Sequence, residues 1–179
     1  MRIGYINEMS TTLRHNHLVS SFFGDIFPLF KSKQVFPLLE NCALVFLGEK
    51  GEGVERLIDP KLIDDKEYFL STEIYTLEYI QPDFLIFRWN DFVQDNNLLR
   101  VAGIPDLAVE VWSKSNKKID RELKFRIYSS SDECEHWHIE QDSNAVTCYK
   151  GKQRFNDQCL TKPLKTMSDL EFDLSHLAL

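Results

Sequence analysis

The sequence predicts one domain of mixed α and β structure, in which a central sheet is flanked by helices. Apolar side chains recur every three to four residues over residues 18–30, which is the helical period. A second helical pattern over 116–128 separates two strand patterns, so helices and strands alternate along the chain. Apolar runs with the length of buried strands lie at residues 41–47, 75–89, 106–113 and 135–141.

The composition is that of a globular protein: of 179 residues, 43% are hydrophobic and 27% charged. The formal net charge of −7 argues against broad nonspecific binding to nucleic acid but leaves room for a local basic groove. Six basic residues gather after the third strand pattern: Lys114, Lys117, Lys118, Arg121, Lys124 and Arg126. No apolar run is long enough for a membrane helix, no signal-peptide pattern opens the chain, and the four cysteines form no CxxC pair. We therefore expect a cytoplasmic protein with reduced thiols and no membrane partner.

The first half of the chain contains two polar candidate residues, one on a predicted helix and one at the start of a predicted strand. The helix is expected to begin near Ser10 or Thr11, either of which can cap it, and to end or kink at Pro28. His15 falls at the edge of the buried face of this helix. Asp83 follows a proline and precedes an apolar run, which places it at the mouth of a strand.

The strand predicted over 106–113 carries two carboxylates on one face. Side chains alternate between the two faces of a strand, so Asp106 and Glu110 share a face with Trp112. The opposite face is wholly apolar and holds Leu107, Val109 and Val111. Buried, unpaired carboxylates are very costly, so we expect a partner, which can be a metal, a lysine or a hydrogen-bonding network.

The helix after this strand presents two stripes. An apolar stripe is predicted to pack on the sheet and consists of Ile119, Leu123 and Ile127. Asp120, Lys124 and Tyr128 form the neighbouring stripe, from which Lys124 can reach toward the strand of Glu110. The alternative is an ordinary surface pair between Asp120 and Lys124, worth about 0.5 kcal/mol.

The strand predicted over 135–141 has two histidines on one face, His136 and His138. Alternating histidines occur in zinc sites, but no further ligand stands at a fixed spacing, so solvent-facing or network histidines are favoured. The remaining elements expected are a hairpin turn at Ser143-Asn144, a short strand near Cys159 and a last helical turn at 174–177.

Three carboxylates and one lysine indicate a chemistry. Asp83, Asp106 and Glu110 are oxygen ligands of the kind that Mg²⁺ or Mn²⁺ prefers. A bound metal generates hydroxide and stabilises a phosphoryl group, and Lys124 can orient the water or neutralise developing charge. Together they suit hydrolysis of a phosphodiester.

Several dispersed motifs are similar to those of a known family. GIPDLAVEVWSKSNKKIDRELKFRIY, with QPDFLIF upstream, RHNH in the first helix, EHWHIE after the second and FDLSHL at the end, resembles the Uma2 (DUF820) family. The resemblance covers nearly the whole chain and implies one nuclease domain over residues 1–179. The implied fold is the restriction-endonuclease-like PD-(D/E)xK core, with a helix, an antiparallel three-strand meander, a crossover helix and a further strand.

The resemblance also implies roles for individual residues. Asp83 and Glu110 match the two acids of the motif, and Asp106 would assist with metal. The lysine of the motif would fall on Trp112, so Lys124 looks like a replacement that has migrated to the helix. His15 would stand near the site.

Three functions remain open on this basis. The first is a Mg²⁺- or Mn²⁺-dependent endonuclease that cleaves DNA, working as a homodimer, and a continuous basic rim around the carboxylates would favour it. The second is a non-catalytic dimeric binding or assembly module, which the acidic net charge and Trp112 favour. The third is a hydrolase of a smaller phosphate ester, which a closed pocket too small for a duplex would favour.

Overall fold

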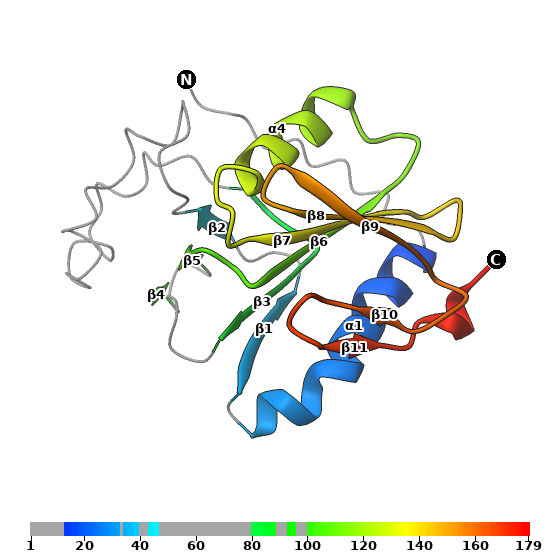
Figure 1. The fold of residues 1–179 in the computed structure, drawn as a ribbon, viewed down its shortest axis with the longest axis horizontal. Coiled ribbons are helices and arrows are strands. Elements are labelled where there is room, and N and C mark those ends of the chain that lie inside the picture. Colours follow the sequence, from blue (N-terminus) through cyan, green and yellow to red (C-terminus); the bar gives the residue numbers. More distant parts are fainter. Residues whose placement is uncertain (1–12, 33, 40–42, 47–79, 89–92, 96–99) are drawn as a thin grey trace.

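The computed structural model describes residues 13–32, 34–39, 43–46, 80–88, 93–95 and 100–179 (Figure 1). A six-stranded mixed sheet forms the centre, with its strands in the order β1-β3-β6-β7-β8-β9. The bounds of these strands are Val35–Leu39 for β1, Phe84–Arg88 for β3, Leu107–Trp112 for β6, Glu135–Glu140 for β7, Ala145–Lys150 for β8 and Gln153–Cys159 for β9.

The strand directions agree with the predicted order of elements. β1, β3 and β6 pair antiparallel and form a three-strand meander. β6 and β7 pair parallel, and helix α4, Lys118–Tyr128, makes the crossover that a parallel pair requires. β7, β8 and β9 then pair antiparallel. The mixed α/β, restriction-endonuclease-like fold class is therefore confirmed.

The first strand of the meander is not the one predicted. Residues 35–39 form it, whereas the predicted run at 41–47 contributes β2, Ala43–Phe46, to a separate three-stranded sheet. In that sheet β2 pairs with β5, Arg100–Gly103, and β5 pairs with β4, Val93–Asp95. Pro37 argues against a strand at this position in the sequence, because proline has no N–H to donate to a neighbouring strand. β1 can include a proline because it lies at the edge of the sheet.

Helix α1, Leu13–Lys31, covers one face of the sheet. Its apolar stripe is buried as the period predicts: Leu18, Val19, Phe22 and Ile26. The ring of Phe22 packs 5.4 Å from that of Phe84 on β3, which ties the helix to the sheet. The helix continues for almost one turn beyond Pro28. The predicted caps Ser10 and Thr11 lie outside the described residues.

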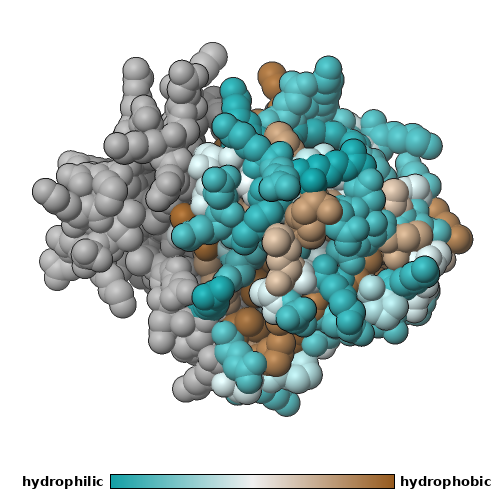
Figure 2. Space-filling model, viewed as in Figure 1, coloured by the Kyte–Doolittle hydropathy of each residue, from teal (hydrophilic) through white to brown (hydrophobic). Residues whose placement is uncertain are grey.

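Helix α4 covers the opposite face, but with a different stripe from the one predicted (Figure 1). Ile119 is 69% exposed, so the expected apolar contact fails at the first position of its stripe. Tyr128 is fully buried instead and packs with Leu85, Phe87 and other residues of this face. The helix is turned this way because Lys124 and Tyr128 both bond to Glu110 on β6. Hydrophilic side chains cover the outside of the molecule over α4 (Figure 2).

The end of the chain closes the core beside α1. It forms the hairpin of β10, Leu164–Lys165, and β11, Glu171–Phe172, followed by the short helix η2, Ser175–Leu177. The Phe172 ring lies 4.9 Å from that of Phe22 on α1. Among the helices that the structure describes, none has the length and apolarity needed to cross a membrane.

Candidate functional site

Three of the four predicted site residues lie around one pocket of about 140 Å³. Asp83, Glu110 and Lys124 line it, together with His15 from α1. These side chains come from the start of β3, the middle of β6, and the helices α4 and α1. Further residues of the wall are Val111, Trp112, Ser113, Ser115, Asn116 and Gln141.

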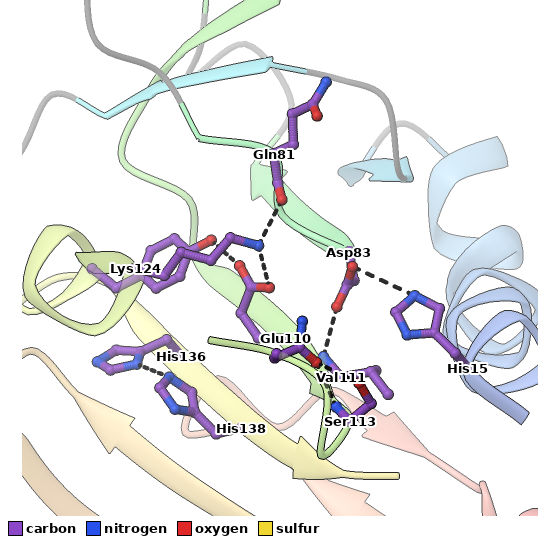
Figure 3. Close-up of polar contacts among 11 residues, drawn as sticks. His15, Gln81, Asp83, Glu110, Val111, Ser113, Lys124, His136 and His138 are labelled. Carbon is purple, nitrogen blue, oxygen red and sulfur yellow. Dashed lines mark hydrogen bonds and ion pairs between the residues drawn. The ribbon is translucent and has the colours of Figure 1, made fainter. Parts of the chain in front are cut away.

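Strand pairing brings the two acids together. Phe84 on β3 pairs with Val109 on β6, so the antiparallel register carries Asp83 to the level of Glu110. Oδ2 of Asp83 accepts a hydrogen bond of 2.7 Å from the backbone N–H of Val111, which holds the carboxylate against the neighbouring strand. His15 Nε2 lies 3.5 Å from Oδ1 of Asp83 (Figure 3).

The carboxylate of Glu110 is fully buried and receives two strong hydrogen bonds. Lys124 Nζ donates to Oε2 and the Tyr128 hydroxyl donates to Oε1, both at 2.6 Å. Lys124 Nζ also donates to the backbone carbonyl of Gln81 at 2.8 Å (Figure 3). The lysine therefore joins α4 to both acid-bearing segments, of which the sequence predicted only the strand of Glu110.

Burial is the largest single influence on the pKa values of Glu110, Lys124 and Tyr128. It raises the pKa of Glu110 to about 7, an effect that Lys124 opposes and the nearby Asp83 carboxylate reinforces. Burial lowers the pKa of Lys124, but the charges of Glu110 and Asp83 outweigh it and leave that pKa raised. Burial and the Glu110 charge raise the pKa of Tyr128, so its phenol stays protonated and donates.

Trp112 occupies the position where the PD-(D/E)xK motif has its lysine. Its side chain is buried, and Nζ of Lys124 lies 5.3 Å from the centroid of the indole ring. The guanidinium carbon of Arg121 lies at the same distance from it. The cation that reaches the acid therefore comes from the helix and packs on the aromatic ring that fills the usual position.

Asp106 does not join the other acids. Its Oδ2 accepts the backbone N–H of Arg88 at 2.8 Å, and its Oδ1 lies 3.0 Å from Arg88 Nε, so it closes the end of β3. Four residues along an extended strand span about 13 Å, which separates Asp106 from Glu110 although both were predicted on one face. Asp106 is not among the residues that line the pocket.

The two histidines of β7 form a network with each other. His136 Nε2 lies 2.9 Å from the carbonyl of Gly151, which can only accept, so this nitrogen carries the proton. His136 Nδ1 then accepts from His138 Nε2 at 3.1 Å. Burial lowers the pKa of His136 to about 4 and, with the charges of His136, Arg121 and Lys124, that of His138 to about 3. Both rings are therefore neutral near pH 7.

A loop between β6 and α4 forms part of the pocket rim. Ser113, Ser115 and Asn116 line the pocket from this loop, and Arg121 donates to the carbonyl of Ser113 at 2.6 Å. The same guanidinium bonds Glu140 on β7, which anchors the loop to the sheet. The predicted basic cluster begins in this loop and continues along α4, and the side chains of Lys114 and Lys118 are about 90% exposed.

The sequence patterns did not identify the loop residues Ser113, Ser115 and Asn116 of the pocket wall, nor Gln141, nor Tyr128, which bonds Glu110 from behind the wall. Tyr128 lies one turn after Lys124 on the same helical stripe, and that spacing could have placed it on Glu110. Gln141 follows the end of β7, and its N–H bonds the carbonyl of Trp112 at the end of β6. β6 and β7 are parallel neighbours, so they end at the same edge of the sheet. The position of Gln141 just after β7 could therefore have placed it near the end of β6.

The donor set of the pocket fits a hard divalent cation. Asp83 and Glu110 supply carboxylate oxygens, and Mg²⁺ commonly takes one or two carboxylates while water and substrate phosphate complete its shell. Within the described ranges, no group of three or more histidine, cysteine, aspartate or glutamate side chains is arranged to hold a metal. Among the described residues, Asp83 and Glu110 are the acids that line this pocket.

Comparison with known proteins agrees with the fold and the motifs. The family model of Uma2, described as "Putative restriction endonuclease", matches residues 58–174, which include Asp83, Glu110 and Lys124. The crystal structure of "a putative nuclease belonging to DUF820" from Anabaena variabilis superposes with a TM-score of 0.56 at 14% identity. That match covers 93% of this chain and 80% of the other and shows a shared fold. No curated protein matches the chain. Because the family model spans well over half of its length, the chain belongs to the Uma2 family.

Proposed function

We propose that this protein is a metal-dependent endonuclease that hydrolyses phosphodiester bonds in DNA. The observation that carries the proposal is the convergence of Asp83, Glu110 and Lys124 from three elements on one polar pocket. We propose that residues 1–179 act as one nuclease domain and that two copies form a homodimer, so that two pockets address the two strands of a duplex.

Each residue has a distinct task in this proposal. Asp83 and Glu110 hold Mg²⁺ or Mn²⁺, which when bound supplies an activated water and stabilises charge on the phosphoryl group. Lys124 has three N–H donors, and the described contacts with Gln81 and Glu110 use two of them. The third is available for a phosphate oxygen or the attacking water. Asp106 enters only as a stabilising residue at the end of β3.

The surroundings of the pocket suit a phosphodiester backbone. Lys114 and Lys118 are exposed, close in sequence to residues of the pocket rim, and pair at the surface with Asp142 and Glu122; a DNA phosphate can compete for such weakly held cations. Electrostatic attraction of this kind is local, which reconciles DNA binding with the net charge of −7. Ser115 and Asn116 add polar groups at the rim.

The test is Mn²⁺ binding by calorimetry together with cleavage of plasmid DNA. Glu110→Gln removes the charge and keeps the shape, and we expect it to abolish both. Glu171→Gln changes an exposed glutamate on β11 and is the matched control. Metal binding or cleavage that survives in Glu110→Gln would exclude the proposed site.

A second candidate function is a non-catalytic module on the same fold. It is favoured because Lys124 and Tyr128 already satisfy both oxygens of Glu110 inside the protein.

A third candidate function is hydrolysis of a smaller phosphate ester, which a pocket of about 140 Å³ suits. Hydrolysis of bis(p-nitrophenyl) phosphate without DNA cleavage would select the smaller ester, and DNA binding without any hydrolysis would select the module.

A further inference from the structure

Tyr128 stands apart from the residues that can touch a substrate. It is fully buried and is not part of the pocket wall, yet its hydroxyl donates a 2.6 Å hydrogen bond to Oε1 of Glu110. We propose that Tyr128 is a positioning residue, which holds Oε1 and so directs Oε2 of Glu110 to Lys124 and a metal in the pocket. This inference rests on the proposed function.

The geometry divides the two oxygens of one carboxylate between two donors. Lys124 and Tyr128 are four residues apart on α4, so their side chains leave the same face of the helix one turn apart. Each reaches a different oxygen of Glu110 at 2.6 Å. A single rigid helix therefore sets the rotation of the carboxylate, which a glutamate on an open surface would change freely.

The phenol ring is itself held in place. It packs in a buried cluster with Leu85, Phe87 and Ala108, and lies 5.6 Å from the ring of His136. A ring held by these contacts keeps its hydroxyl at one position. A fixed hydroxyl is what is needed to orient the carboxylate of Glu110 precisely. Partners of this kind, which bond to a metal ligand and not to the metal, typically change metal affinity or activity about 10- to 100-fold when removed.

A purely structural tyrosine makes a different prediction. If Tyr128 served only the core, phenylalanine would fill the same space, and the variant would lose stability without a change in metal affinity. If Tyr128 positions Glu110, the carboxylate in Tyr128→Phe keeps only its bond from Lys124 and can rotate about it, and metal binding weakens. The dissociation constant for Mn²⁺ therefore distinguishes the two roles, independently of any assay of cleavage.

The experiment compares Tyr128→Phe with Tyr149→Phe by Mn²⁺ calorimetry on the full chain. Tyr149 on β8 also packs against His136, with ring centroids 5.0 Å apart, but it is absent from the pocket wall. We expect Tyr128→Phe to raise the Mn²⁺ dissociation constant about 10- to 100-fold and to lower kcat for DNA cleavage more than it changes KM. Tyr149→Phe is expected to bind Mn²⁺ as the wild type does.

The possible outcomes are separable. Wild-type Mn²⁺ affinity in a folded Tyr128→Phe protein, with binding lost in Glu110→Gln, overturns the role of Tyr128 and leaves the proposed function standing. A wild-type protein that binds no Mn²⁺ overturns both. If Tyr128→Phe does not fold, difluorotyrosine at position 128 keeps the shape and strengthens the hydroxyl as a donor. A changed Mn²⁺ dissociation constant then supports the inference, and an unchanged one overturns it.

Discussion

Lys124 Nζ lies 2.6 Å from Oε2 of Glu110, and the pair joins helix α4 to the central strand β6 in the interior of the protein. The Glu110 side chain is fully buried and that of Lys124 is 19% exposed. Removing one member of a buried pair leaves the other charge without compensation, so this contact stabilises the fold, whatever its part in the proposed reaction.

Replacing Lys124 by alanine is expected to separate these two effects. Lys124→Ala should retain Mn²⁺ binding, because both acids remain, and should lose DNA cleavage. Its free energy of unfolding should fall by about 3 kcal/mol, since Glu110 loses its cation. Urea unfolding with and without Mn²⁺ checks this, and we expect the metal to restore part of the loss. Lys118→Ala, at an exposed position of α4, is the control. Abolished Mn²⁺ binding in Lys124→Ala would show that the lysine has another role.

The affinity for Mn²⁺ is expected to rise with pH between 6 and 8. The pKa of Glu110 is raised to about 7, chiefly by burial, so the carboxyl group is largely protonated at pH 6 and must lose its proton to bind a metal. Raising the pH from 6 to 8 should lower the apparent dissociation constant about tenfold in total, with most of the change below pH 7. Calorimetry in buffers of different ionisation enthalpy measures the proton released. Binding without proton release at pH 6 would contradict this assignment.

Asp106→Asn tests the acid that lies outside the pocket. We expect the variant to bind Mn²⁺ normally, because Asp106 bonds to Arg88 and is absent from the pocket wall. Its free energy of unfolding should fall by about 1–2 kcal/mol through the weaker bonds to Arg88. Calorimetry and chemical denaturation measure the two quantities. Loss of Mn²⁺ binding in a folded Asp106→Asn protein would return this residue to the metal site.

Acid is expected to destabilise the protein through the histidine network. Burial lowers the pKa of His136 to about 4, so between pH 6.5 and 4 the unfolded chain binds a proton that the folded protein does not. Stability therefore falls as the pH is lowered through this window, by about 3 kcal/mol for this group at pH 4. His136→Gln should reduce that slope in urea unfolding at pH 7.5, 5.5 and 4.5. Glu110 contributes a slope of opposite sign, which cancels when the two proteins are compared; equal slopes would refute the prediction.

Much of the site could be predicted from local sequence patterns. The alternation around Glu110 determines that a carboxylate stands on a buried strand, because side chains of an extended chain alternate between two faces. The spacing of Lys124 on the helix places it toward that strand, and Gln81-Pro82 before Asp83 marks the start of β3. These features depend on residues close together in the chain. The spacing of apolar side chains and the position of proline therefore determine them.

Only the tertiary structure decided which of these residues meet. The pairing of β3 with β6 brings Asp83 to Glu110, while the length of the extended strand leaves Asp106 at the opposite end with Arg88. The rotation of α4 buries Tyr128 and exposes Ile119, against its apolar pattern. Both results depend on packing and hydrogen bonds between segments that are distant in sequence. The spacing of apolar residues within one segment carries no information about the energies of those contacts. The sequence by itself determined the chemical groups and the elements that carry them, and long-range packing determined which groups form the site.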